Sequence, residues 1–448
     1  MNKIEALLTQ ALDLARQQGA EDADVVVSQG ESDTALVRNG TVEGVKHSEQ
    51  LGLGLRVFID GKVALVSTHD VSAEALSHCA ERACDMAAAL PPSPFDGLLE
   101  DIPHKIDSAS IDQLDLVDRK TILKTPDLIA QAQEMEQTAL GYKDVTNSNG
   151  ASASRACRTV GYATSRGFLS SYQRTYFNRS ISVVAGPKEA MERDYASHSA
   201  LHYADLKNGE TLGREAAERA VNRLHPQKPH TATLPVIFDR RISSSLIEHF
   251  LAAINGSALV QKTSFLTEKM GEKIFPENVT IEDKPLIPRG LGSHPFDMEG
   301  HDVYDLNLAW HGLLTNWLLD SRCARQLGLP CNGRAARSYA SAPHPGISNI
   351  IMRPGQQTQE DMIREIPEGV LITEMMGNAI NPLTGDYSRG ASGFMIRQGN
   401  IAEPLSGFTI AGNLNDMFSR FDPASDLLME NTINAPSIRI DGMTIAGE

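Results

Sequence analysis

The sequence predicts an α+β protein of two domains, with helices and antiparallel sheets in the first domain and more strands in the second. Two observations support this organisation. The chain has 448 residues, more than a single hydrophobic core usually accommodates. Amphipathic helical segments alternate with β-rich segments, and Pro226, Pro229 and Pro235 mark the strongest break between them. We therefore expect domains over residues 1–228 and 229–448.

The first domain begins with a predicted helix whose apolar residues recur at helical spacing from Ile4 to Ala15 and which ends at Gly19. Strands are then expected over residues 24–28, 34–38, 51–59 and 63–67. The pairs Asn39-Gly40 and Asp60-Gly61 favour hairpin turns between strands. A second helix is expected over residues 72–90, where two prolines end it.

The rest of the first domain begins with a proline-rich connection over residues 91–110 and a helical stretch over 114–140, interrupted near Pro126. Further strands are expected over residues 156–163, 168–174 and 180–185. A strong helix over residues 210–224 completes the domain.

The second domain begins with a short apolar strand over residues 235–239, which leads directly into a helix over 243–259. From residue 262 onward, short strand-like segments are separated by Gly, Pro and Asn, with one short helix near residues 359–366. This half is therefore expected to be the more β-rich of the two.

Charge and cysteine usage exclude several classes of protein. Lys and Arg number 41 against 57 Asp and Glu, and the net charge of -16 would repel nucleic acid and an anionic membrane surface. The five cysteines are odd in number and widely spread, which is typical of reduced thiols in a cytosol. The first 19 residues lack the features of a signal peptide, and no run of some 18 apolar residues could span a membrane. We expect a cytoplasmic protein.

Several histidines and cysteines of the sequence are residue types that bind transition metals. His198 and His202 have the spacing of a zincin pair, but Ser199 occupies the place of the general base and the segment alternates like a strand. A second group lies in a turn-rich stretch where solvated loop residues are the favoured interpretation: His294, Asp297, Glu299, His301, Asp302, Asp305 and His311. The cysteine pairs Cys79/Cys84 and Cys323/Cys331 have neither a redox nor a zinc arrangement.

Motifs for nucleophilic or phosphate chemistry are incomplete. The segment Gly390–Phe394 lacks the final glycine of a G-x-S-x-G nucleophile elbow. The glycine pair in Gly52-Leu53-Gly54 lies within an alternating strand and does not open a helix, so it does not predict a dinucleotide site. The residues alone therefore predict no catalytic constellation.

Several sequence blocks together are more informative than any of these motifs. They are MERDYA (191–196), GSALVQKTSFL (256–266), SHPFDMEG (293–300), NPLTGDYSRGA (381–391), FTIAGNLNDMF (408–418) and the closing MTIAGE. In this order they resemble the TldD/PmbA family of metallopeptidase-related proteins, and within it the TldE/PmbA branch. The resemblance covers nearly the whole chain.

The resemblance implies a pair of homologous subunits. TldD-type subunits carry an HExxxH-type zinc motif on a helix and a late cysteine ligand, whereas TldE-like subunits have lost both. The motif aligns here with residues 248–253, so that the first ligand, the base and the second ligand become Glu248, His249 and Ala253. The segment Asn431–Pro436 stands where the cysteine is supplied and has no thiol. The resemblance thus implies no metal ligands and no catalytic residues in this chain, with zinc held by the TldD-type partner.

Helix geometry leads to the same expectation, because adjacent residues such as Glu248 and His249 point about 100° apart and do not converge on one ion. The family implies a cytoplasmic, ATP-independent protease for small or unfolded peptides, linked in some bacteria to microcin maturation and antitoxin turnover. This chain would be its non-catalytic subunit, binding a TldD-type metallopeptidase and helping to hold an extended peptide at a strand edge.

Partner or substrate contacts are expected at the turn Gly385–Gly390, through Asp386, Tyr387, Ser388 and Arg389; a purely structural turn is an equal alternative. Two other functions stay open: a metal-free peptide-binding or chaperone-like protein that acts without TldD, and a self-sufficient hydrolase with an unfamiliar site. Because the paired subunits are homologous, the isolated chain is also expected to be able to form a homodimer.

Overall fold

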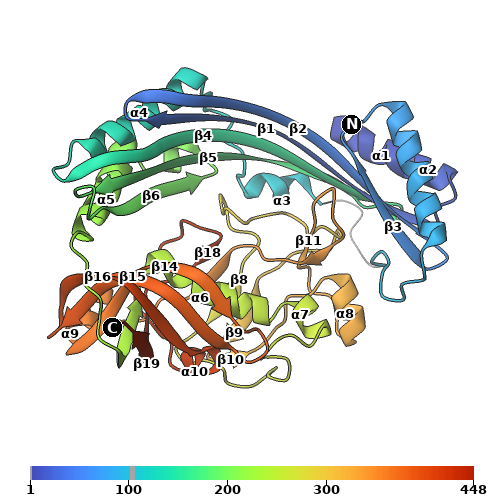
Figure 1. The fold of residues 1–448 in the computed structure, drawn as a ribbon. Coiled ribbons are helices and arrows are strands. Elements are labelled where there is room, and N and C mark those ends of the chain that lie inside the picture. The colour runs from blue at the N-terminus through green and yellow to red at the C-terminus, as the bar shows by residue number, and fades with distance from the viewer. Residues whose placement is uncertain (1–2, 101–105, 448) are drawn as a thin grey trace.

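A single curved sheet of six long strands dominates the first half of the chain and arches over the second half (Figure 1). The computed structural model describes residues 3–100 and 106–447. All neighbours in the sheet are antiparallel, in the order β3-β2-β1-β4-β5-β6. Its strands are β1 (Asp22–Arg38), β2 (Thr41–Ile59), β3 (Lys62–Thr68), β4 (Val145–Thr164), β5 (Leu169–Ala185) and β6 (Glu192–Ala200).

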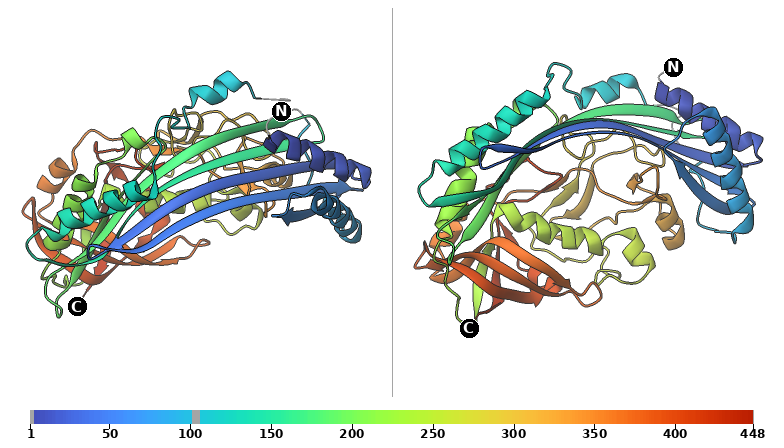
Figure 2. Two further views of the ribbon diagram at one scale, coloured as in Figure 1. Left: turned by 90° about the horizontal axis from the view of Figure 1, so that it is seen from above. Right: turned by 45° about the horizontal axis from the view of Figure 1, so that its top comes forward.

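Helices cover the outer face of this sheet at both ends, as both views in Figure 2 show. They are α1 (Lys3–Gln17) and α2 (Ala73–Ala89) at one end, and α4 (Thr125–Leu140) and α5 (Gly209–Asn222) at the other. Two short helices, α3 (Ser108–Gln113) and the 3-10 helix η1 (Tyr203–Asp205), lie in the connections. Alternation along β1 explains the packing, because successive side chains point to opposite faces. Val25 and Val27 pack under α1 and α2, whereas Val26 faces the second half of the chain beside Phe296.

The second half is built around a small barrel. Strands β16, β15, β14, β7 and β19 follow one another, and pairing of β16 with β19 closes the ring. A separate five-stranded sheet has the order β10-β9-β8-β13-β18. The barrel strands and their neighbours are β7 (Ala232–Phe238), α9 (Gln359–Arg364), β14 (Glu368–Ile380), β15 (Asp386–Arg397), β16 (Asn400–Asn413), α10 (Leu414–Phe418), β17 (Asp422–Pro423) and β19 (Ile438–Ala446). The remaining elements are α6 (Arg240–Ala253), α7 (Gly256–Val260), β8 (Ile281–Asp283), β9 (Leu306–Trp310), β10 (Leu313–Leu314), α8 (Ser321–Leu327), β11 (Ala335–Ala336), β12 (His344–Pro345), β13 (Ile350–Met352) and β18 (Ile433–Asn434).

The α+β class is confirmed, and so are the helices expected near residues 4–19, 72–90 and 210–224. The expected helix over 114–140 is wrong in its first part, because Leu116 accepts a backbone hydrogen bond from Thr175 and the helix starts only at Thr125. The expected helix over 243–259 is two helices, α6 and α7, since Asn255 caps a new start.

The strands of the first half are longer than expected. The segments predicted over 24–28 and 34–38 form one strand, β1, whose polar middle is paired on both sides, with β2 and with β4. Likewise, β5 joins the strands expected over 168–174 and 180–185. Polar residues in mid-strand suggested breaks, but the backbone continues its ladder there. The polar side chains are partly solvated in β1, whereas Thr175 and Arg179 of β5 are buried and hydrogen-bonded. Within the described residues, no helix is long and apolar enough to cross a membrane.

The two halves meet at a buried charge cluster on the inner face of the sheet. Asp24 of β1 is fully buried and accepts hydrogen bonds from Arg56 of β2 and from Arg337 of the second half. Tyr162 of β4 donates to the same carboxylate, with an O–O distance of 3.2 Å. Burial alone would raise the pKa of Asp24, but the two guanidiniums outweigh it and hold that pKa below its usual value.

A glycine pair beside this cluster allows close backbone contact. A Cβ at Gly52 would meet the Tyr339 ring at 2.6 Å, and a Cβ at Gly54 would lie 1.7 Å from the Tyr339 carbonyl oxygen. The pair that superficially resembled part of a dinucleotide motif therefore serves to seat a loop of the second half on β2.

We predict that Gly54→Ala lowers the free energy of unfolding by about 2 kcal/mol or more, because the loop at Tyr339 must move away from the sheet. Chemical denaturation measures the change. Gly44→Ala in the same strand is the control, since no described heavy atom lies within 4 Å of a Cβ built there. Equal stability of the two variants would contradict this account of the contact.

Candidate functional site

Helix α6, which carries the aligned motif positions, packs on the barrel. Its cap is Asp239, whose Oδ1 accepts from the Arg241 backbone N–H at 2.9 Å. Leu246, Ile247 and Phe250 bury one face of the helix in the core of the second half. The residues around the motif are therefore held by ordinary amphipathic packing.

The three motif positions point to different surroundings. Glu248 is exposed, and Ala253 is buried in the core with only a methyl group. His249 is half-buried; its ring lies 5.9 Å from the Tyr387 ring in an edge-on contact, and its Nε2 is buried without a hydrogen-bond partner. Burial and the nearby Arg389 charge lower the pKa of His249 to about 4. These residues do not fit a zinc ion, because one donor faces solvent, one faces an aromatic ring and the third is absent.

The C-terminal segment predicted to replace the cysteine does lie against this helix. Ser243 Oγ donates to the Ala435 carbonyl oxygen at 3.3 Å. Asn434 is buried and donates to the carbonyl oxygens of Asn431 and Ile350. The structure thus brings the segment Asn431–Pro436 to α6, where it offers backbone and amide groups.

The other histidines and cysteines do not assemble. His198 lies 3.8 Å from Glu430, whereas His202 contacts the Asp115 carbonyl oxygen. His294, His301 and His311 each contact a different carbonyl oxygen. Burial raises the pKa of Cys323 and of Cys331 to about 12. Across residues 3–100 and 106–447, no group of three or more His, Cys, Asp or Glu is placed to hold a metal ion.

The turn predicted to contact a partner is split between surface and core. Asp386 and Ser388 are exposed, and hydrogen bonds from Thr384 and Asn413 lower the pKa of Asp386. Tyr387 is only 2% exposed and contacts His249 inside the chain. Arg389 donates from Nε to the Gly377 carbonyl oxygen at 2.9 Å. Asp386 and Ser388 therefore stay available for contacts, whereas Tyr387 has a packing role.

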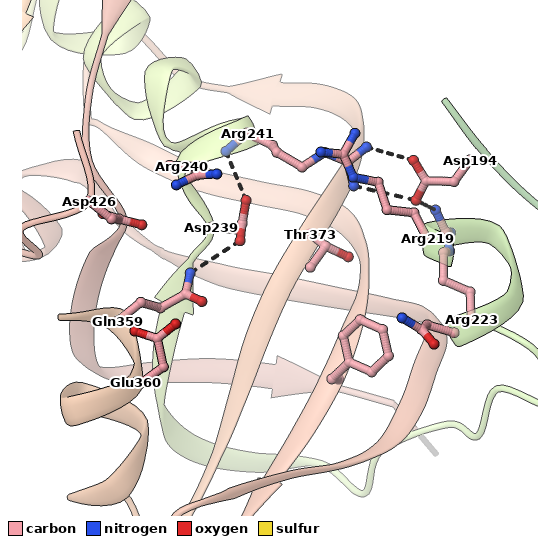
Figure 3. Close-up of a pocket in the computed structure, with 12 residues that line it drawn as sticks. Asp194, Arg219, Arg223, Asp239, Arg240, Arg241, Gln359, Glu360, Thr373 and Asp426 are labelled. Atoms are coloured by element: carbon pink, nitrogen blue, oxygen red, sulfur yellow. Dashed lines mark hydrogen bonds and ion pairs between the residues drawn. The ribbon is translucent and has the colours of Figure 1, made fainter. Parts of the chain in front are cut away.

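Sequence reasoning missed a polar pocket at the start of α6, where the halves meet again (Figure 3). The cavity has a volume of about 300 Å³ and is lined by Asp194, Arg219, Asn222, Arg223, Asp239, Arg240, Arg241, Gln359, Glu360, Thr373, Phe394 and Asp426. Asp194 of β6 accepts from Arg241 at 2.6 Å and from Arg223 at 3.4 Å. The Thr373 hydroxyl is buried and unpaired.

The chemistry of this pocket is that of binding. Its lining includes no His, Cys or Ser among the described residues, and its one hydroxyl, that of Thr373, is not hydrogen-bonded to a base. Arginines and carboxylates are both abundant, which suits polar groups such as the backbone of a peptide. The only sequence signal was indirect: Asp194 lies in the MERDYA block, and the dipeptide Arg240-Arg241 follows the first strand of the second half.

Comparisons with known proteins define the class. Models of the PmbA/TldA metallopeptidase domains match three consecutive segments: domain 1 over residues 23–87, the central domain over 121–224 and the C-terminal domain over 231–447. The metalloprotease PmbA of Escherichia coli O157:H7 is 33% identical, with 99% of this chain and 96% of the relative covered. The fold and these matches define a metallopeptidase-related protein.

Solved structures agree. A Bacteroides thetaiotaomicron protein named as a candidate modulator of DNA gyrase superimposes with a TM-score of 0.92 at 25% identity, over 100% of both chains. TldE from Thermococcus kodakarensis shares the fold, with a TM-score of 0.85 at 20% identity over 98% of this chain and 99% of that one. The chain belongs to the PmbA/TldD family.

We predict that His249→Phe weakens the pH dependence of stability between pH 6.5 and about 4. The neutral imidazole's contribution is complete above 6.5, its ordinary pKa, and is lost as the pH falls toward its folded pKa of about 4. Denaturation at several pH values measures the slope. His230→Gln, which removes an exposed imidazole, is the control; a parental slope in His249→Phe would contradict the prediction.

Proposed function

We propose that this chain is the non-catalytic subunit of a TldD/TldE-type zinc metalloprotease complex of the cytoplasm, which acts on small or unfolded peptides. By analogy with the family, its substrates include microcin precursors and antitoxins. The strongest support is the arrangement of the three aligned motif positions on α6. Glu248 faces solvent, His249 packs on Tyr387, and Ala253 has no donor atom in its side chain. Zinc would be held by the TldD-type partner.

The subunit's own contribution would be binding. Its long sheet ends in an edge strand, β6, and Tyr195, Ser197 and Ser199 of that strand line a second cavity of about 210 Å³ next to the pocket at α6. An extended peptide gains affinity from backbone hydrogen bonds at such an edge. The exposed side chains of Asp386 and Ser388 remain the proposed contacts for the partner or the substrate.

The test is to mix the purified chain with a TldD-type metallopeptidase and to measure mass by light scattering and cleavage of an unfolded peptide. We expect a heteromeric complex, peptide cleavage by the mixture only, and zinc that co-purifies with the metallopeptidase partner. Glu248→Gln in this chain should leave cleavage unchanged, whereas replacing the first histidine of the partner's HExxxH motif should abolish it.

Cleavage by the isolated chain together with stoichiometric zinc would overturn the proposal in favour of a self-sufficient hydrolase. Peptide binding by the isolated chain without any complex would favour the metal-free peptide-binding alternative. A homodimer that dissociates when the partner is added would agree with the proposal.

A further inference from the structure

A cavity of about 180 Å³ lies between the inner face of the long sheet and loops of the second half. Figure 1 shows β11, which forms part of its wall, beneath the sheet. From the sheet, Ser28, Arg158 and Tyr172 line it; from the second half, Phe296, Arg337 and Tyr339 do so. This cavity is separate from the pocket at α6 and from the aligned motif positions, which share no lining residue with it.

Arg337 places a buried guanidinium in the wall of this cavity. Its side chain is buried in the charge cluster, where Nη1 donates to Asp24 and Nε donates to the Ser341 carbonyl oxygen at 3.0 Å. Its Nη2 is buried and has no hydrogen-bond partner. A buried guanidinium N–H without an acceptor is costly, so the cavity calls for an acceptor from outside the chain.

A second cation at the same cavity, unlike Arg337, has no acidic partner among the described residues. Arg158 of β4 donates from Nε to Ser28 Oγ at 3.0 Å, and no carboxylate of a described residue forms an ion pair with it. Asp297 is the acid in the lining, but its Oδ1 accepts from the Glu299 and His301 backbone and its Oδ2 accepts from the Ala335 backbone. The cavity wall therefore contains one arginine without an acidic partner, Arg158, and one guanidinium N–H without an acceptor, that of Arg337 Nη2.

The remaining walls are apolar and aromatic. Tyr172 and Phe296 meet edge-to-face with centroids 5.5 Å apart, and Val26, Met298 and Ile347 complete this side. Pockets for small molecules combine such walls with a few fixed polar groups. The ligand that fits this combination has a compact anionic end and an apolar body.

We propose that this cavity binds a carboxylate attached to an apolar or aromatic body, with the carboxylate held by Arg337 and Arg158 and the body packed against Tyr172 and Phe296. The C-terminal residue of a short peptide and a free carboxylic acid share this chemistry. The peptide source rests on the proposed function, in which the chain handles peptides; the carboxylate site itself does not.

The test is calorimetric titration of the full-length isolated chain with four probes: N-acetylphenylalanine, its C-terminal amide, a pentapeptide ending in phenylalanine, and the amide of that pentapeptide. We expect the acids to bind at least tenfold more tightly than the matching amides, because charge-assisted hydrogen bonds to the guanidiniums are lost. Binding of both acids assigns the cavity to peptide ends as well as free acids, and binding of the small acid alone assigns it to free acids.

Single-residue variants distinguish an effect on ligand binding from an effect on folding. Arg158→Gln should weaken binding of the acids about tenfold, and it is suitable because the side chain is largely exposed and outside the buried cluster. Arg16→Gln, on the exposed side of α1, should not change binding. Arg337→Gln is informative only alongside these, since it also removes a partner of Asp24.

Acids and amides of equal affinity, absence of saturable binding by any probe, or unchanged binding in Arg158→Gln would each overturn the proposal. The titrations use no metallopeptidase partner, so their failure is distinct from a failure of the chain to form a complex.

Discussion

The arrangement of the two halves depends on the ion pairs that the buried Asp24 carboxylate forms with Arg56 and Arg337. A lone ion in this environment would be strongly unfavourable, and removing one partner of a buried pair costs far more than an exposed pair contributes. The cluster therefore ties β1 and β2 of the sheet to a loop more than 300 positions along the chain. With three charges in one place, a displaced loop would leave guanidinium and carboxylate groups without partners.

The neighbouring features follow from this anchor. The loop at Tyr339 can approach β2 only because Gly52 and Gly54 have no side chain. Where the loop stands off the sheet, the inner face keeps charged and hydroxyl residues such as Arg158 and Ser28, and the apolar-walled cavity forms between them. At the other contact between the halves, Asp194 pairs with Arg223 and Arg241, so arginine–carboxylate pairs join the halves at both places. The inner face of the sheet thus carries charged and hydroxyl groups beside an apolar cluster around Phe296, whereas the outer face is apolar where the helices pack.

Local signals were enough to predict the α+β class, most helices and the hairpin turns. Asn39 and Gly40 both adopt positive φ, as the turn chemistry of that pair requires. The lengths of β1 and β5 were not predictable locally, because polar residues in mid-strand resemble loop sequence, while pairing with neighbouring strands holds them extended. The Asp24 cluster was not predictable either, because its members are far apart in sequence and each alone resembles a surface charge.

The candidate site was partly predictable for the same reasons. The 100° step of a helix predicts that neighbouring side chains diverge, and Glu248 is exposed while His249 contacts the Tyr387 ring. Side chains alternate between the two faces of a strand, so Tyr387 points inward between the exposed Asp386 and Ser388. The prediction of Tyr387 as a contact residue did not take this alternation into account. The pocket at α6 needs residues from β6, α5, α6 and α9, and its assembly is a property of the tertiary fold.

A double-mutant cycle on Asp24→Asn and Arg337→Gln, measured by chemical denaturation, tests most directly whether this buried cluster joins the halves. Each single change should cost about 3–5 kcal/mol, because it leaves buried groups uncompensated. The double variant should cost less than the sum of the two by about 2 kcal/mol, which is the coupling expected of residues in one network. Additive losses, or a single Asp24→Asn variant as stable as the parent, would contradict the account.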